Sequence, residues 1–386
     1  MQTTEKKKSS TAERIVITGV GLLAPVGASC RDTAAAILEG RSAYQAHETV
    51  QVLNSPSGDV LRGATISRIS DDLLPKELEG IDRMEALLIP PIAECLRALP
   101  DSLHGFVDWE IILPDTIRVD NNILVSLAKK ISRLQLSSGK VCASLNPRGK
   151  FISRIAYAGE LLLTHRIEGV VVACADSLCD TTRLNKLMLD GRLKDPDNPY
   201  GILAGEAGGA VLLERESAAR LRKAPILAAI STWGSATEPH PWPDGKPSKA
   251  LGLTTAFHQA FSKLGDRGAS VLHVITDENG ERARALEWSL TAGRIFPNPD
   301  QERYLWHPAV VTGDTGGSLA AVVLADAIMR LIINTPPSGR IALAASDDRG
   351  SRQVLCLEHI DQPERKEYFA KIRSILGGRK TAMEEQ

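Results

Sequence analysis

Short apolar runs, turn residues and amphipathic stretches alternate along the first half of the chain. The run at 14–27 predicts a buried strand followed by a glycine-rich turn. The segment 32–38 predicts the start of a helix, with Asp32 or Thr33 as its cap and Gly40 as its end. This part of the sequence therefore indicates a strand, a turn and a helix in succession.

The clearest periodic unit covers 150–166, where apolar residues recur with the 3.6-residue spacing of a helix. Strands are expected on either side, at 140–145 and 169–173, with a turn at 146–149. The other elements expected in this half are a turn-rich stretch at 42–82, a helix at 83–99 disturbed by Pro90 and Pro91, a strand at 109–113, a helix at 121–131 and a strand at 207–214.

The second half repeats this order of elements. It predicts strands at 226–232, 272–276, 309–312 and 340–345, a glycine-rich turn at 313–317, a helix at 318–333, and a hairpin turn at 347–350 that leads into a strand at 353–357. The charged segment 214–223 is expected to be helical and to connect the halves. Two similar α/β halves with mixed five-stranded sheets predict a layered α/β/α/β/α fold. The expected boundaries are a disordered tail at 1–12, an N-terminal half at 13–223, a C-terminal half at 224–376 and a disordered tail at 377–386.

Composition narrows the classes of function. The 386 residues are 43% apolar and 24% charged, and the formal net charge is −1. A near-neutral chain with 4% aromatic residues is not expected to bind nucleic acid or an anionic membrane. The first ten residues are polar, and no apolar run approaches the length of a membrane span, so we expect neither a signal peptide nor a transmembrane segment.

The six cysteines are scattered and contain no Cys-x-x-Cys pair. We expect them to be buried free thiols in a reducing, cytoplasmic compartment. No cysteine has a histidine pair at ligand spacing, so no metal and no cofactor is predicted.

The most specific motif is 197–214, with the sequence DNPYGILAGEAGGAVLLE. It resembles the D-G-F-x-x-G-E-G-A-G-x-x-x-L-E stretch of β-ketoacyl synthases, in the thiolase-like superfamily. The run at 14–27, the Gly-Arg-Ser of 40–42 and the Trp-Pro-Asp-Gly of 242–245 resemble further parts of that family. Most of the chain is covered, although 45–140 matches poorly and is shortened. The resemblance implies a thiolase-like fold of two halves.

The family uses a cysteine at a helix N-terminus, where the helix dipole favours the thiolate, together with two histidines and a supporting lysine. Carried over by spacing, the nucleophile falls on Gly149. The first histidine falls on Asp277, the second on Asp314 and the lysine on Ala309. The family's gating loop falls on 346–350. The resemblance therefore implies a pseudoenzyme, which keeps the scaffold without the catalytic cysteine and histidines.

Other candidate residues have two interpretations each. Asp277, Glu278 and Asp314 form either an acidic pocket for acid–base work or cation binding, or polar turns in which Asp314 and Thr315 cap a helix. His240, beside an aromatic residue, either lines a cleft or belongs to a rigid proline-rich surface loop. Cys142 is either a displaced nucleophile or a core thiol.

Two glycine-flanked features are weaker candidates. Glu206, between Gly205 and Ala207, is interpreted as a structural partner of backbone groups. The Gly19-x-Gly21 turn is similar to a dinucleotide fingerprint, but the synthase-like interpretation already accounts for its glycines.

The resemblance implies a non-enzymatic adaptor or partner-binding scaffold in bacteria, linked in related degenerate proteins to type VI secretion effectors. The alternative is a chain-length-factor-like subunit of a ketosynthase heterodimer in fatty acid or polyketide biosynthesis, although that group carries Gln where this chain has Gly149. A second alternative is an acyltransferase of the 3-oxoacyl-ACP synthase type with relocated catalytic residues. The expected partners are a second copy or a ketosynthase-like protein, and a protein effector or acyl carrier protein.

Overall fold

Two five-stranded sheets with the same strand order form the framework of the protein. The structure is a computed structural model, and it describes residues 13–53, 61–100, 107–117, 120–133, 141–146, 150–164, 167–296, 298, 301, 303–333 and 336–377. In each half, the strands numbered in chain order lie in the order 3-2-4-5-1, and the fifth is antiparallel to the other four. The first sheet contains β1 (Ile15–Leu23), β4 (Val107–Pro114), β5 (Val141–Asn146), β6 (Gly169–Ser177) and β7 (Ala204–Arg215). The second contains β8 (Ala228–Thr237), β9 (His273–Thr276), β10 (Tyr304–Trp306), β11 (Arg340–Ser346) and β12 (Ser351–Glu358). The predicted mixed five-stranded sheets are confirmed.

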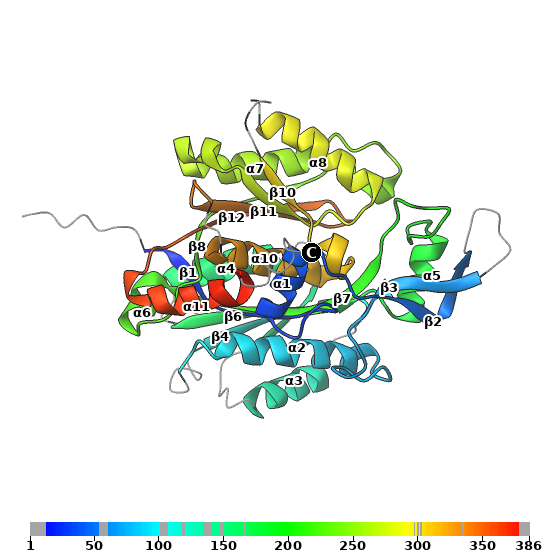
Figure 1. The fold of residues 1–386 in the computed structure, drawn as a ribbon, viewed down its shortest axis with the longest axis horizontal. Coiled ribbons are helices and arrows are strands. Elements are labelled where there is room, and N and C mark those ends of the chain that lie inside the picture. The colour runs from blue at the N-terminus through cyan, green and yellow to red at the C-terminus, as the bar shows by residue number, and fades with distance from the viewer. Residues whose placement is uncertain are drawn as a thin grey trace, which may run out of the picture.

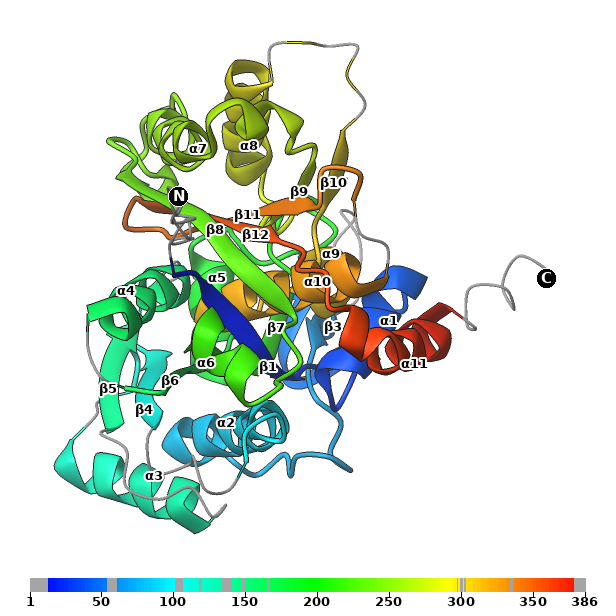
Figure 2. The same ribbon diagram turned by 90° about the vertical axis from the view of Figure 1, so that its left-hand side faces the viewer.

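The sheets are joined where β1 and β8 pair antiparallel, from Ile15 to Ile17. This pairing leaves β5 and β10 as the two ends of the continuous strand order, on opposite sides of the molecule (Figure 2). A smaller antiparallel pair, β2 (Tyr44–Leu53) and β3 (Leu61–Ser67), attaches to the start of β7 where Ile66 aligns with Ala204.

Helices cover both sheets and fill the space between them, which gives the predicted α/β/α/β/α layers (Figure 1). The outer helices are α2 (Gly80–Leu96) and α3 (Asn121–Arg133) on one side and α7 (Leu251–Leu264) and α8 (Arg282–Ile295) on the other. The middle layer contains α1 (Cys30–Glu39), α4 (Lys150–Thr164) and α10 (Leu319–Ile333). The remaining helices are α5 (Thr181–Leu189), α6 (Glu216–Leu221), α9 (Ala309–Thr312) and α11 (Lys366–Gly377).

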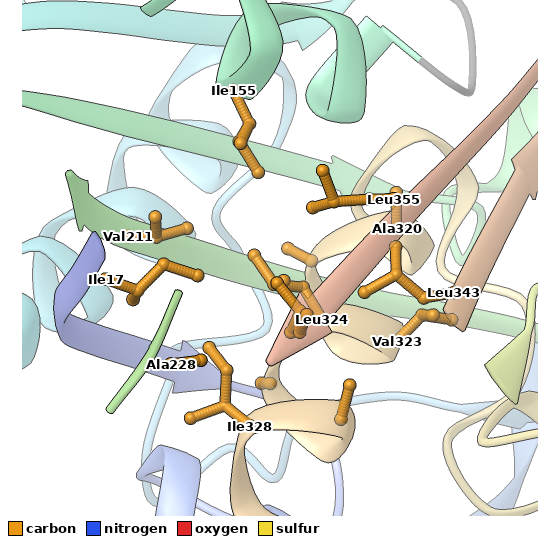
Figure 3. Packing of buried hydrophobic residues seen from close by; sticks show 14 of the residues in the cluster. Ile17, Ile155, Val211, Ala228, Ala320, Val323, Leu324, Ile328, Leu343 and Leu355 are labelled. Carbon is orange, nitrogen blue, oxygen red and sulfur yellow. The ribbon is translucent and has the colours of Figure 1, made fainter. Parts of the chain in front are cut away.

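The helix α10 is apolar over almost its whole surface because it lies between the two sheets, and its buried Asp326 is paired with Arg330 of the next turn at 2.9 Å. Leu324 and Ile328 are buried among side chains from both sheets, including Ile17 of β1 and Leu355 of β12 (Figure 3). A helix buried all round needs no polar face. Among the described residues, Gly316–Ile333 is the one helix long and apolar enough to cross a membrane, and 89% of it is buried inside the protein. Its composition is therefore that of a core helix.

The glycines of the 197–214 motif permit close packing of β7. A Cβ at Gly208 would lie 1.9 Å from the carbonyl oxygen of Leu87 in α2, and one at Gly209 would lie 2.5 Å from the Cβ of Ala321 in α10. Both distances are far shorter than a van der Waals contact. The most specific motif of the sequence is thus explained by backbone packing at the centre of the fold.

Two predictions of secondary structure are wrong: the strand expected at 309–312 and the turn-rich stretch expected at 42–82. Residues 309–312 form the short helix α9, because Pro308 precedes them and the amides of Val311 and Thr312 bond to its carbonyl. The strand lies earlier, at β10, and pairs parallel with β9. The stretch 42–82 contains the β2–β3 pair, although its sequence lacks a strong period.

The first helix begins two residues before the predicted start. Ser29 is its N-cap, and it accepts a hydrogen bond from the Asp32 amide at 3.1 Å while its hydroxyl donates to the Asp32 carboxylate at 2.6 Å. Ser29 is therefore the cap, and Asp32 lies in the first turn of the helix, where its carboxylate holds the Ser29 hydroxyl. The helix α2 continues through Pro90 and Pro91, and Gly40 ends α1 as predicted, in the left-handed conformation.

Candidate functional site

Each half supplies a side chain that bonds to a backbone amide at, or just before, the start of a helix of the other half. Asp176, at the end of β6, accepts a hydrogen bond from the amide of Gly317 at the start of α10 (2.6 Å). Gln353 of β12 accepts one from the amide of Ser153 in α4 (3.1 Å). A carboxylate near the start of a helix is stabilised by the exposed amides and by the helix dipole. These contacts fix the relative position of the halves where the carboxyl ends of their strands meet.

Asp176 is enclosed tightly at this position. Its carboxylate also accepts the Ser177 amide at 2.8 Å and a charged hydrogen bond from Arg183 of α5. A Cβ at Gly316, which has a φ of 63°, would lie 2.2 Å from the Asp176 carboxylate. The turn before α10 therefore requires glycine for both its conformation and its contact with Asp176.

A hollow of about 280 Å³ opens beside these contacts, at the carboxyl ends of β4, β6 and β11. Ligands of open α/β sheets bind at such strand ends. Most of its wall is charged, with residues of both signs from both halves. The charged wall residues are Asp115, Asp176, Arg183, Lys186, Asp190, Arg192, Asp347, Asp348 and Arg349.

Arg192 connects the halves at the rim of the hollow. Its guanidinium donates to both carboxylate oxygens of Glu281 (2.7 and 2.9 Å) and to Asp348 (2.8 Å). Burial favours the neutral guanidine, but the bonds to Glu281 and Asp348 outweigh it and raise the pKa of Arg192. For Glu281, burial favours the protonated form, and the Arg192 contact reverses this and leaves the pKa below its usual value. Both groups are therefore charged at neutral pH.

Two further pairs lie on the rim. Arg349, on the β11–β12 turn, pairs with Asp115 after β4, and Lys186 pairs with Asp190 at 2.9 Å. Both pairs are substantially exposed, so solvent screens them and each contributes little to stability.

The position expected for the first histidine holds a carboxylate with structural bonds. Asp277 follows β9 and is 7% exposed. Its side chain accepts the amide of Ser346 at 2.6 Å, and its own amide donates to the Ala344 carbonyl at 3.2 Å. These bonds hold the end of β9 against the end of β11.

Asp314, at the position expected for the second histidine, is bonded in a similar way. It is 1% exposed, and its carboxylate accepts the Gly316 amide at 2.9 Å and the Asn279 side-chain amide at 2.6 Å. The bond to Gly316 supports the predicted role of Asp314 at the start of the helix. Ala309, at the lysine position, is buried in α9. Gly149, at the nucleophile position, belongs to 147–149, which lie outside the described residues.

The three carboxylates of the proposed acidic cluster have different partners. Asp277 contacts the Ser346 amide, Asp314 contacts Asn279, and Glu278 lies 3.3 Å from Nε2 of His307. Within the described part of the chain, no group of three or more His, Cys, Asp and Glu side chains is arranged to hold a metal ion. The contacts fit polar turns and a helix cap better than a pocket shared by all three carboxylates.

His307 is a site residue that the sequence interpretation did not select. Its Nδ1 lies 2.8 Å from the Thr276 hydroxyl, while its Nε2 faces Glu278. Burial lowers the pKa of His307, even though Glu278 and Asp277 favour the protonated form. The parallel register that aligns Trp306 with Ile275 places His307 beside Thr276. That pairing of β10 with β9 is a tertiary contact that no local pattern specifies.

The remaining candidates lie outside this arrangement. His240 is in a surface loop, with Nδ1 3.2 Å from the Asp244 carboxylate and 41% of its side chain exposed. Cys142 lies in β5, opposite Glu110 in the register with β4, and its side chain lies outside the described part of the structure. Glu206 is fully buried and accepts bonds from the Ile69 amide and from Arg83, as expected of a structural carboxylate.

The five cysteines whose side chains are described are buried and free, as predicted. Burial raises the pKa of each of these thiols, for Cys356 to about 12. A thiol with a raised pKa is a poor nucleophile at neutral pH.

Neither the known family models nor the curated protein sequences give a match to this chain. Solved structures do. A ketosynthase of a type II polyketide synthase, in complex with its acyl-carrier protein, superposes with a TM-score of 0.73 over 91% of this chain and 100% of its own, at 12% identity. The ketosynthase from module 6 of the bacillaene synthase of Bacillus subtilis 168 gives 0.72, over 90% and 72%, at 13% identity. The ishigamide ketosynthase/chain length factor gives 0.70, over 91% and 100%, at 16% identity.

The chain has the thiolase-like fold of the ketosynthases. Identities of 12 to 16% establish the fold, while function has to be argued from the site.

Proposed function

We propose that this protein is a non-catalytic, ketosynthase-like subunit that binds a protein partner. The observation that supports this most strongly is the presence of buried, hydrogen-bonded carboxylates, Asp277 and Asp314, where the resemblance places the two histidines. Condensation of thioesters needs donors that stabilise negative charge on the thioester oxygen. An ionised carboxylate only accepts hydrogen bonds and would repel that charge.

The hollow supports the same proposal. A hydrocarbon chain in it would remove charged groups such as Arg183 and Asp347 from water without offering them a partner. The Arg192 contacts to Glu281 and Asp348 also hold the rim in one arrangement. A hollow that is lined by charges and held by ion pairs between the two halves is more typical of a rigid scaffold than of an acyl-binding tunnel.

The proposed partner is a second chain of the same fold, either another copy or an active ketosynthase. Among the described residues, β5 pairs on one side alone, with β4, and is the last strand of the sheet. The backbone groups on the other side of such a strand can pair with a strand of another chain. Two of the similar structures are, by their descriptions, a ketosynthase with its acyl-carrier protein and a ketosynthase/chain length factor.

The absence of catalysis is tested by intact-protein mass spectrometry after incubation with malonyl- and acyl-loaded carrier proteins. We expect no acyl adduct and no released carbon dioxide, while an active ketosynthase tested in parallel gives both. The matched variant is Cys142→Ser, because the side chain of Cys142 is the displaced nucleophile considered above. An adduct on the protein that disappears in this variant would overturn the proposal and support relocated acyltransferase chemistry.

The chain-length-factor-like role is the second candidate, supported by the similarity to the ishigamide structure. It is distinguished by mixing or co-expressing the protein with an active ketosynthase. A stable heterodimer that changes the length or the yield of the product would support the chain-length role. Binding without any change in product would support the adaptor role, and light scattering of the protein alone would show whether it forms a homodimer.

A further inference from the structure

A second, smaller cavity lies inside the C-terminal half, between β9, β11, α7 and α8. Its volume is about 10 Å³, and Leu253 of α7 and Trp288 of α8 form part of its apolar wall. Its polar wall includes Asp277, Glu278 and Arg284. A cavity of this size admits about one water molecule.

Arg284 brings a donor without a partner to this cavity. The side chain is 8% exposed, and its Nη2 donates to the Ser346 carbonyl at 3.4 Å and to Asp348 at 3.3 Å. Its Nη1 is fully buried and has no hydrogen-bond partner among the residues that the structure describes. Leaving a buried donor unsatisfied is unfavourable, and more so for a charged group. Buried polar groups that lack a protein partner are usually satisfied by ordered water.

We infer that one ordered water molecule occupies this cavity, accepts a hydrogen bond from Nη1 of Arg284 and donates to the carboxylates of Asp277 and Glu278. Water is the ligand that suits both kinds of wall, because it accepts from the guanidinium and donates to the acids. The adjacent carboxylates repel an anion, and the charge of Arg284 repels a metal cation. Glu287, the third acid of the wall, is already paired with Arg352 at 2.7 Å.

The water adds a link between the Asp277 carboxylate and α8. The Asp277 carboxylate is bonded to β11 through the Ser346 amide, and the water joins it to Arg284 of α8. The loop after β9 is then held from both sides. The inference rests on this cavity and on Arg284, and it stands whether or not the protein is catalytic.

A high-resolution crystal structure of the protein tests the inference directly. We expect an isolated density peak at about 2.7–3.2 Å from Nη1 of Arg284. Absence of this peak, with Nη1 bonded directly to a carboxylate, would overturn it.

Oxygen-17 magnetic relaxation dispersion, which counts long-lived internal water molecules, tests it in solution. Ala344→Val adds bulk to a residue of the cavity wall and should remove one such water. Ala342→Val is the matched control, because Ala342 is buried on the same strand and does not line the cavity. An unchanged count in A344V would refute the inference, and if A344V does not fold, the wild-type crystal structure decides.

Discussion

Replacing Arg192 with methionine removes a charge that joins the two halves while keeping most of the apolar stem of the side chain. In the native protein the Arg192 guanidinium bonds to both oxygens of Glu281 and to Asp348. The side chain of Glu281 is 7% exposed. In the variant it keeps the Asn279 side-chain amide at 3.1 Å but loses the cation to which it is hydrogen-bonded. Asp348 is 36% exposed, so water compensates for much of its loss.

The expected loss of stability follows from this difference in exposure. Removing one partner of a buried ion pair costs about 3–5 kcal/mol, because an uncompensated charge stays behind. We expect a loss of about 3 kcal/mol, at the lower end of that range, because Arg192 itself is partly exposed and Asn279 still bonds to Glu281. Exposed pairs contribute about 0–1 kcal/mol. Arg349→Met, which breaks the exposed pair with Asp115, is therefore the matched control with little expected effect.

The pH dependence gives a second signature of the same contact. Arg192 holds the pKa of Glu281 below its usual value, against the opposing effect of burial. A lowered folded-state pKa adds stability above the unfolded pKa of about 4.3, and this stability is lost as the pH falls toward the folded value. Without Arg192, only Asn279 and Arg284 still oppose the effect of burial on Glu281. The pKa of Glu281 then rises, so the variant should lose stability on acidification at a higher pH than the wild type.

Urea unfolding followed by circular dichroism at pH 7 and pH 5 measures both effects. At neutral pH, a decrease in the free energy of unfolding of less than about 1 kcal/mol for R192M would refute the prediction, because an exposed pair contributes that much at most. A decrease no larger than that of R349M would also refute it.

Three other changes have defined outcomes. Gly208→Ala should lower the free energy of unfolding by about 3 kcal/mol, because its Cβ would lie 1.9 Å from a backbone carbonyl oxygen. Gly293→Ala in α8 is the control, because the space around Gly293 is open. In the same urea assay it should leave stability unchanged or slightly higher. Burial lowers the pKa of His307, so its neutral form adds stability above the unfolded pKa of about 6.5 that is lost as the pH falls. His307→Gln should flatten the pH dependence of the melting temperature between about pH 7.5 and 5.5, and an unchanged slope would contradict this. Iodoacetamide at pH 8 should leave Cys356 unlabelled in the native protein, and rapid labelling detected by peptide mass spectrometry would contradict its burial and its raised pKa.

Local patterns were sufficient for elements whose own residues determine them. The 3.6-residue period of 150–166 predicted α4, and the apolar run at 14–27 predicted β1, because burial of one face or of a whole strand leaves a direct trace in the sequence. Local patterns gave the wrong secondary structure where the neighbouring segments determine it. The apolar residues 309–312 look like a strand, but Pro308 and the contacts of the turn that follows make them helical.

The sequence likewise identified some residues of the candidate site and not others. Spacing from the 197–214 motif led to Asp277 and Asp314, and both lie buried at strand and helix ends of the C-terminal half. The same reasoning passed over Arg192 and His307. Their partners, Glu281 and Thr276, are 89 and 31 residues away along the chain.

The sequence by itself determined the layered fold and the residue types at the positions of the resemblance. Only the tertiary structure decided what those residues do. Whether a carboxylate is a base, a metal ligand or a structural acceptor depends on the donors that surround it. For Asp277 and Asp314 those donors are the Ser346 amide and the Asn279 side chain, which folding alone brings within hydrogen-bonding distance.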